Sequence, residues 1–199
     1  MAVTRERFEQ GMTFDAYKAQ MTRNQERFAE NEHLLQLDAD DVAAFKKLPQ
    51  PLNVLVIAED WCGDVIDNLP ILGSLAEASG KLNLRVFLRD QNLDLIDQYL
   101  NKGEFRSIPV FVFFDNDFNE LGHFIERPES VTARRAEQRK KLFAEHPEFG
   151  SPDTPFAQLP EEVRVKVSEA SAQSREATKA DDNRAVVQAL REIVSGARA

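Results

Sequence analysis

The chain has 199 residues, of which 42% are hydrophobic, and a formal net charge of −9. This length fits one core domain with extensions, and the hydrophobic content is that of an ordinary globular core. The negative charge argues against nucleic acid and anionic membrane as partners, and no apolar run approaches the roughly 18 residues of a membrane helix.

Cysteine and histidine are too sparse for a metal centre or a disulfide framework. Cys62 is the only cysteine of the sequence, and the three histidines, His33, His123 and His146, are far apart. A zinc site usually needs clustered ligands at short spacing. The N-terminal residues contain no apolar signal core. We therefore expect neither metal nor cofactor, and a cytoplasmic location.

Residues 1 to 50 are predicted to be helical. Their apolar residues recur at helical spacing: Phe14, Tyr17, Met21 and Phe28. Thr13 is a suitable N-cap for this helix, and Asp40 could cap a second helix that ends before Pro49. We expect the aromatic residues to pack onto a central sheet and not to form a ligand site.

Residues 51 to 147 begin with an alternation of strand and helix. Leu52 to Ala58 is apolar and rich in β-branched residues, which is typical of a strand buried on both faces. Residues 63 to 79 fit a helix that Pro70 should kink. Leu82 to Leu88 is predicted to be the second strand, because its apolar residues alternate with polar ones.

The following segments predict a short helix and a hairpin. Leu93 to Leu100 fits the helix, Val110 to Phe114 and Phe118 to Glu126 fit two strands, and Asp115 to Asp117 fits the turn between them. The order strand, helix, strand, helix, strand, strand predicts a mixed four-stranded sheet covered by helices, in the α/β class.

The last part of the chain is charged and helical. Helices are predicted from about 129 to 145 and from about 161 to 197, with a linker-like stretch from Pro147 to Pro160 between them. The second helix carries a modest apolar stripe: Val186, Val187, Leu190 and Val194. This stripe either docks on the same domain or forms a homo-oligomer contact through the C-terminal helix.

These segments define the expected domain organisation. Residues 1–50 form an N-terminal helical segment packed on the core, 51–147 form the core domain, and 148–199 form the linker and the C-terminal helical extension.

Cys62 lies at a strand-to-helix turn, which is a favourable place for a reactive thiol. The free N–H groups and the dipole at a helix N-terminus favour the thiolate, the reactive form. The neighbouring charge of Asp64 opposes ionisation, and Glu59, Asp60 and Asp67 extend an acidic rim. The direction of the thiol's pKa shift therefore stays open. The alternative is a small buried hydrophobe without chemistry.

Several local motifs then resemble the thioredoxin superfamily. Residues 58 to 63, A-E-D-W-C-G, resemble the thioredoxin sequence A-E-W-C-G with one extra acidic residue. Pro70 occupies the place of the family's helix-kinking proline, and D-Q-N at 90 to 92 resembles the sequence after the middle strand. R-S-I-P at 106 to 109 resembles R-G-I-P, whose proline is the family's cis-proline, and Gly122 matches a glycine of the last strand.

These matches occur in the correct order over residues 52 to 126 and imply a thioredoxin-like fold. The longer string W-C-G-D-x-x-x-N-L-P, from Trp61 to Pro70, resembles a bacterial branch of thioredoxin-like proteins. Members of that branch often lack the second active-site cysteine and carry an N-terminal helical segment. With them, the resemblance extends over roughly residues 10 to 147.

The resemblance implies a site around one thiol. Its residues are the catalytic Cys62 and its neighbours Trp61, Gly63, Asp64, Val65, Arg106, Ile108 and Pro109. Val65 stands where the family has its resolving cysteine, and Val56 stands where it has a buried aspartate. Ordinary dithiol thioredoxin activity is therefore not expected.

Three functions remain open at this point. The first is monothiol redox exchange, in which Cys62 forms a mixed disulfide with a protein or a low-molecular-weight thiol, as part of cell redox homeostasis. The second is a non-catalytic binding module for a peptide or partner protein beside Pro109. The third is a structural or oligomeric protein. We favour redox exchange over the binding module, and we rank the structural role third.

Two charged residues have open roles. Arg106 would favour the thiolate if it lies near Cys62, but a plain surface arginine is an equal alternative. Asp64 could relay a proton to a leaving thiol, although we prefer a helix-start residue. Arg85, Arg89 and Arg127 offer no comparable reason to expect a role.

Overall fold

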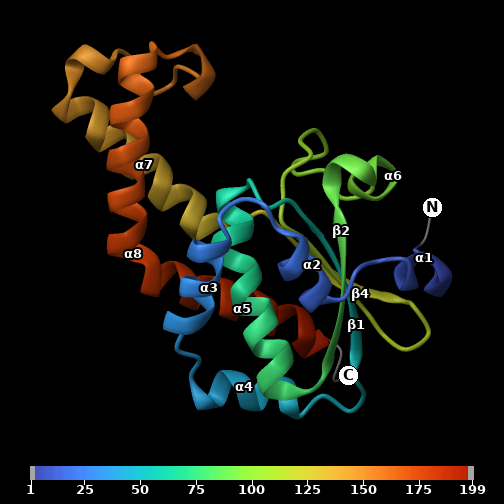
Figure 1. Ribbon diagram of the computed structural model, residues 1–199. Coiled ribbons are helices and arrows are strands. Elements are labelled where there is room, and N and C mark those ends of the chain that lie inside the picture. Colours follow the sequence, from blue (N-terminus) through green and yellow to red (C-terminus); the bar gives the residue numbers. More distant parts are fainter. Residues whose placement is uncertain (1–2, 197–199) are drawn as a thin grey trace. The chain divides into compact units, whose positions relative to one another are not determined.

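A mixed sheet of four strands forms the centre of the fold in the computed structural model, which describes residues 3–196 (Figure 1). The strands are β1 (Leu52–Ala58), β2 (Leu82–Leu88), β3 (Val110–Phe114) and β4 (Glu120–Ile125). Their order is β2-β1-β3-β4, with β1 and β2 parallel and the other neighbours antiparallel. The predicted mixed four-stranded sheet of the thioredoxin-like fold is confirmed.

Helices precede, connect and follow the strands. The α-helices are α1 (Arg5–Glu9), α2 (Phe14–Gln20), α3 (Gln25–Leu34), α4 (Ala39–Lys46), α5 (Gly63–Ser79), α6 (Leu93–Ile96), α7 (Glu129–Glu145) and α8 (Glu161–Gly196). Short 3₁₀ turns lie at Arg89–Gln91, Pro147–Phe149 and Phe156–Gln158. The end predicted for the last helix, residue 197, lies outside the described residues.

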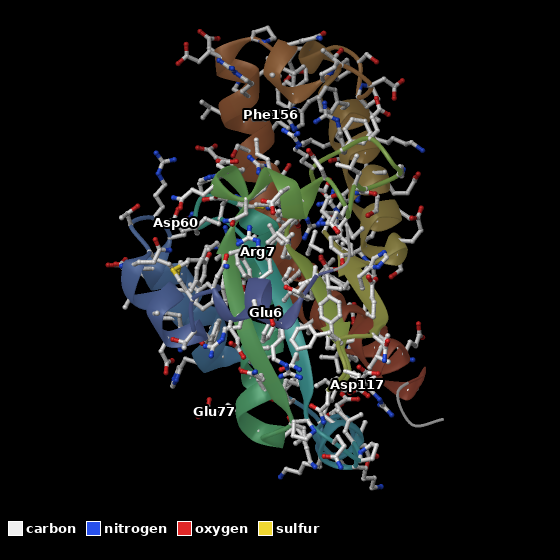
Figure 2. All side chains as sticks on the ribbon, turned by 90° about the vertical axis from the view of Figure 1, so that its right-hand side faces the viewer. Glu6, Arg7, Asp60, Glu77, Asp117 and Phe156 are labelled. Atoms are coloured by element: carbon white, nitrogen blue, oxygen red, sulfur yellow. The ribbon has the colours of Figure 1, made fainter. Side chains whose placement is uncertain are left out.

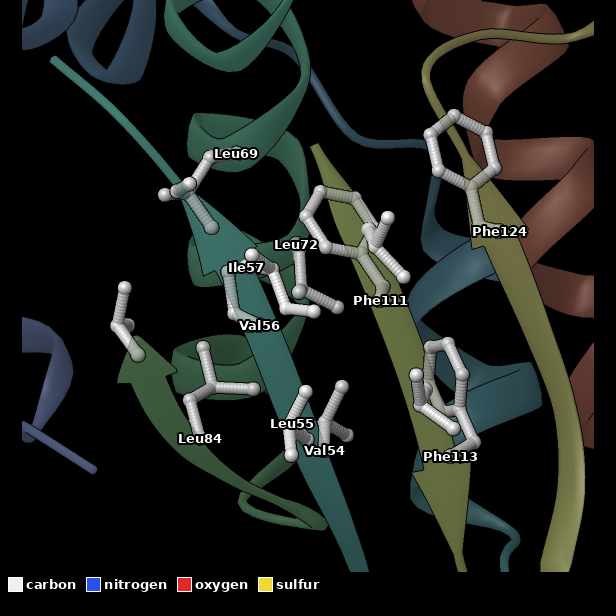
Figure 3. Packing of buried hydrophobic residues seen from close by; sticks show 14 of the residues in the cluster. Val54, Leu55, Val56, Ile57, Leu69, Leu72, Leu84, Phe111, Phe113 and Phe124 are labelled. Carbon is white, nitrogen blue, oxygen red and sulfur yellow. The ribbon is translucent and has the colours of Figure 1, made fainter. Parts of the chain in front are cut away.

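The sequence places β1 at the centre of the core because each of its residues is apolar or, like Asn53, paired. All seven residues of β1 are buried. Figure 3 shows Val54, Val56 and Ile57 of β1 among Leu69 and Leu72 of α5 and the phenylalanines of the neighbouring strands. Burying one such side chain contributes roughly 1.5–3 kcal/mol, so this layer fixes β1 and the turn that follows it.

The helix α5 connects β1 to β2 and continues through Pro70. A proline has no N–H, so the carbonyl of Ile66, four residues earlier, loses its helical partner. The buried side chain of Asn31 in α3 replaces that partner, with Nδ2 donating to the Ile66 carbonyl at 2.8 Å. The helix therefore keeps one continuous run from Gly63 to Ser79.

The N-terminal helices pack against α5 and the sheet edge. α2 lies against β2, while α3 and α4 lie against α5 (Figure 1). Thr13 caps α2 as predicted, its hydroxyl accepting from the Ala16 N–H at 3.2 Å. The N-cap of α4 is Asp38, however, and Asp40 lies inside the first turn.

The bounds of α6 and β4 differ from the sequence prediction. α6 ends at Ile96, because the N–H groups of Gln98 and Tyr99 donate to the carbonyls three residues earlier, of Leu95 and Ile96, and not to those four residues earlier. β4 begins at Glu120 instead of Phe118. The Asp115 carboxylate accepts hydrogen bonds from two backbone N–H groups of the turn, and Phe118 has a φ of 63°, outside the region of regular strands.

The contacts divide the chain into two compact units. One contains the chain up to Arg127 and from Val186 onward, and the other is Pro128–Ala185. The predicted bounds 1–50, 51–147 and 148–199 follow the sequence pattern, whereas the two units follow the contacts. The predicted bounds therefore stay a prediction. The predicted apolar stripe of α8 lies in the first unit, where its four members are buried in the main core: Val186, Val187, Leu190 and Val194.

The second unit has its own small core. Phe143 of α7 and Val167 of α8 contribute to it together with Phe149 and Leu159 from the stretch between the helices. Arg139 donates to the carbonyls of Pro152 and Thr154 at 2.6 and 2.7 Å and so ties that stretch to α7. None of the helices in the described part of the chain is long and apolar enough to cross a membrane.

Candidate functional site

The thiol of Cys62 lies between the N-terminus of α5 and the segment that leads into β3. Cys62 is the N-cap of α5, in extended conformation, because β1 ends at Ala58 and the helix begins at Gly63. Its Sγ donates to the carbonyl oxygen of Ile108 at 3.5 Å. The Ile108–Pro109 peptide bond next to this carbonyl is cis. The structure thus brings together Cys62, Ile108 and Pro109, which are far apart in sequence.

Valines occupy the two positions at which a dithiol site would have its second cysteine and the buried carboxylate that takes part in its proton transfer. Val65 lies in the first turn of α5 and Val56 lies in β1, and both are 0% exposed. Neither can attack a disulfide or carry a proton. Cys62 is a free cysteine and is half-buried. The chemistry of the site is therefore that of one sulfur.

The surroundings of Cys62 favour its thiol form over the thiolate. Burial raises the pKa of Cys62, and this is the largest effect. The backbone N–H groups of Val65 and Asp64 lower the pKa, whereas the charges of Asp64 and Glu126 raise it further. The net direction is upward. The sequence left this direction open, because burial cannot be read from the motif.

A network of three charged groups lies beside the thiol. Arg127 Nη1 contacts Asp64 Oδ2 at 2.5 Å and Glu126 Oε1 at 2.8 Å. The Asn101 Nδ2 donates to Glu126 Oε2 at 2.7 Å, and the Asn68 Nδ2 donates to the Glu126 carbonyl at 2.8 Å. Asp64 therefore lies in the first turn of α5 and is also anchored across the fold to Arg127, just after β4.

Arg127 and Glu126 are the site residues that sequence reasoning missed. The signal was available in the register of the predicted hairpin. Val110 pairs with Ile125, and the N–H of Glu126 donates to the Pro109 carbonyl at 2.7 Å. The residues after the last strand must therefore lie opposite Pro109 and close to Cys62.

The acidic rim before Cys62 is bound by backbone and side-chain donors. Glu59 is only 8% exposed, and its Oε1 accepts the Asp90 N–H at 2.9 Å. Burial raises the pKa of Glu59 more than this hydrogen bond lowers it. One turn along α5, Asp67 pairs with Arg27 at 2.5 Å.

Asp60 ties the loop of the thiol to the N-terminal helices. Its Oδ2 accepts from the backbone N–H groups of Thr22 and Arg23 at 2.7 and 3.0 Å. Burial raises the pKa of Asp60, but these hydrogen bonds outweigh it and the net direction is downward. The Asn24 Nδ2 donates to the Asp60 carbonyl at 2.8 Å. Figure 2 shows Asp60 beside the blue helices of the N-terminal part.

The aromatic and cationic residues predicted around the site have different surroundings. Trp61 is 41% exposed, and the Cζ of Arg89 lies 4.7 Å from its ring centroid. Arg106 is exposed and binds Asp97 through Nε at 2.6 Å and through Nη2 at 2.9 Å. Asp97 thus compensates the charge of Arg106. These are the surroundings of a surface arginine.

Comparisons with known proteins agree with this fold. A protein of unknown function from Pseudomonas aeruginosa has a similar structure, with a TM-score of 0.70 and 23% identity over 99% of both chains. An HIV epitope-scaffold has a TM-score of 0.66 and 20% identity, over 98% of this chain and 99% of its own. At these identities the likeness shows the fold. No curated protein matches significantly.

The sequence itself matches a family model. The model described as "Thioredoxin" covers residues 11–140, which includes the N-terminal helices α2 to α4, the whole sheet and the thiol. The chain belongs to this thioredoxin family.

Proposed function

We propose that the chain takes part in thiol redox exchange through Cys62 alone. The observation that carries this proposal is the position of the Cys62 sulfur at the N-terminus of α5, 3.5 Å from the Ile108 carbonyl beside the cis bond to Pro109. A sulfur at a helix N-terminus has N–H groups available to stabilise its ionised form.

The exchange needs two separate thiols. The Cys62 thiolate attacks one sulfur of a disulfide, a new S–S bond forms, and the other half of the disulfide leaves as a thiolate. An external thiol then attacks the mixed disulfide and restores Cys62. Val65 and Val56 leave no internal group for this second step. The partner is therefore a protein or low-molecular-weight thiol, and we place the exchange in the reducing cytoplasm.

The raised pKa of Cys62 makes the exchange slow at neutral pH. Only the thiolate is nucleophilic, and burial holds the thiolate fraction low. A partner that covers the exposed Trp61 and supplies a cation or a hydrogen-bond donor would increase that fraction. Recognition of the partner would then precede reaction.

A second candidate function is a binding module without catalysis. The raised pKa of Cys62 and the fully buried Val65 favour it, because both reduce thiol chemistry. In this case an extended peptide would pair with the backbone beside Pro109, as an added strand does at a sheet edge.

The two candidates differ in a direct measurement. The purified chain is incubated with oxidised glutathione at about pH 9, near the free cysteine pKa of about 8.5, and its intact mass is measured. Exchange predicts an adduct of one glutathione that a reducing agent removes, and no adduct on Cys62→Ser. A chain that stays unmodified while an unfolded sample reacts would exclude the exchange and leave the binding module.

A further inference from the structure

Arg127 links the first turn of α5 to the end of β4 beside the thiol. Its Nη1 lies 2.5 Å from Asp64 Oδ2 and 2.8 Å from Glu126 Oε1, so one nitrogen contacts both carboxylates. The three side chains are between 14% and 23% exposed, and water screens such partly buried charges only weakly. The two anions are therefore held close together by one shared cation.

Both carboxylates belong to residues beside the turn that carries Cys62. Asp64 lies two positions after Cys62, in the first turn of the helix of which Cys62 is the N-cap. The N–H of Glu126 donates to the Pro109 carbonyl at 2.7 Å, and the sulfur donates to the preceding carbonyl, of Ile108, at 3.5 Å. After burial, the largest cause, the charges of Asp64 and Glu126 also raise the pKa of Cys62. A cation that compensates these two charges therefore acts on the ionisation of the sulfur.

Two other arginines around the site bind different acids. Arg106 binds Asp97 at 2.6 Å. Arg89 binds Asp90 at 2.7 Å. The charges of both guanidiniums are thus compensated elsewhere, and the counter-charge for the two carboxylates beside the thiol is supplied by Arg127.

We propose that Arg127 is a positioning residue for the thiol reaction, because its guanidinium holds the Asp64 and Glu126 carboxylates and compensates their charge beside the sulfur. This inference rests on the proposed thiol exchange and names a residue that controls its first step. In that step the sulfur loses its proton to water, and the thiolate then attacks the disulfide. Two uncompensated carboxylates would oppose the loss of the proton, since a nearby like charge disfavours a further anion.

The test follows the rate of alkylation by iodoacetamide from about pH 6 to about pH 10, a range that spans the free thiol value of about 8.5. Cys62 is the only cysteine of the sequence, so the signal belongs to it. The wild-type chain is compared with Arg127→Gln, which removes the charge, and with Arg127→Lys, which keeps it. Arg27→Gln is the matched control, because Arg27 pairs with Asp67 one turn further along α5. Urea unfolding checks that each variant is folded.

A double variant separates the role of the charge from that of the fold. Asp64→Asn combined with Arg127→Gln removes one anion and the cation together, so the net charge beside the sulfur stays that of the wild type. Its alkylation rate should therefore return close to the wild-type rate. A rate that falls because the fold is damaged would not recover when a second contact is removed.

The inference predicts that Arg127→Gln slows alkylation at pH 7 about three- to tenfold and moves the midpoint of the pH profile upward, the effect of one lost counter-charge. Arg127→Lys should keep most of the wild-type rate, and Arg27→Gln should change the rate less than Arg127→Gln does. An Arg127→Gln chain with the wild-type profile would overturn the inference, as would a double variant that stays as slow as Arg127→Gln.

If Arg127→Gln does not fold, the double variant is compared with Asp64→Asn instead. Loss of the cation must slow alkylation in that background as well, and equal rates would overturn the inference. Iodoacetamide alkylates the thiolate without any disulfide. The glutathione experiment is therefore read separately, and a failed role of Arg127 is distinguishable from a failed exchange.

Discussion

At the scale of single residues, the environment of Cys62 decides what its sulfur can do. The helix N-terminus favours ionisation, but burial and the charges of Asp64 and Glu126 act in the opposite direction and prevail. Asp64 therefore has two effects: its charge is favourable in the first turn of α5, and it disfavours the thiolate. A residue can stabilise the fold and weaken the chemistry of the same turn.

Replacing Asp64 should make Cys62 more reactive. Asp64→Asn removes a charge that raises the pKa of Cys62 and also releases Arg127 from its contact at 2.5 Å. We expect the pKa of the thiol to fall and its alkylation rate at pH 7 to rise several-fold. The measurement is the rate of iodoacetamide alkylation as a function of pH.

Asp67→Asn provides the matched control, since Asp67 lies one turn further along α5 and pairs with Arg27 instead. Its effect on the alkylation rate should be smaller. An Asp64→Asn variant that reacts at the wild-type rate, or more slowly, would show that Asp64 does not oppose the thiolate.

Glu59 predicts a dependence of stability on pH. Burial raises the pKa of Glu59 in the folded state, so the folded chain holds this proton to higher pH than the unfolded chain does. The neutral Glu59 carboxyl therefore contributes its full stability to the folded chain below the unfolded-state pKa of about 4.3. This stability is lost as the pH rises through the raised pKa of the folded state.

Glu59→Gln keeps the oxygen that accepts the Asp90 N–H and cannot ionise. We measure the free energy of unfolding of both chains by urea at pH 4 and pH 7. The difference, variant minus wild type, should be more positive at pH 7 than at pH 4. The exposed Glu104→Gln serves as control. The same stability difference at both pH values would contradict a raised pKa.

At the scale of elements, α5 depends on a side chain from another helix. Pro70 leaves the Ile66 carbonyl without its helical donor, and Asn31 supplies the replacement at 2.8 Å. The same helix presents its N-terminus to Cys62. The N-terminal helices thus hold α5 at Ile66, and they hold the preceding loop at Asp60.

Asn31→Ala should destabilise the chain by about 1–3 kcal/mol, because it leaves a buried carbonyl unpaired. The measurement is urea unfolding, with Glu30→Ala on the exposed side of α3 as control. The cost should shrink in a Pro70→Ala background, in which residue 70 regains the N–H that can bond to Ile66. An equal cost in both backgrounds would refute this pairing.

Much of the sheet could be predicted because its signals are local. The bounds of β1, β2, β3, α5 and α7 follow from apolar runs and their capping residues, and the structure places them as predicted. The end of α6 and the start of β4 could not be predicted, because the chain changes to i→i−3 hydrogen bonds after Ile96 and Phe118 has a positive φ. Phe118 is not a glycine, so the sequence pattern carries little sign of its positive φ.

The site was predictable only where it coincides with a motif. Trp61, Cys62, Ile108 and Pro109 were found through the resemblance to thioredoxins, and the structure brings Cys62 and Ile108 into contact. Arg127 and Glu126 belong to no motif and reach the thiol through the pairing of β3 with β4.

At the scale of the whole molecule, the thiol site lies entirely within one compact unit. The chain up to Arg127 supplies all of its residues, and the final turns of α8 complete the core of the same unit. The apolar stripe of α8 serves this core and is buried there. The chain therefore combines a thioredoxin fold with a site that contains one sulfur.

The most direct test of this account is the rate at which Cys62 forms a mixed disulfide with oxidised glutathione from about pH 6 to about pH 10, a range that spans the free thiol value of about 8.5. The account predicts one removable adduct per chain, with a rate that is low at neutral pH and rises as the thiol with the raised pKa ionises. A folded chain that forms no adduct at any pH would contradict redox exchange at Cys62.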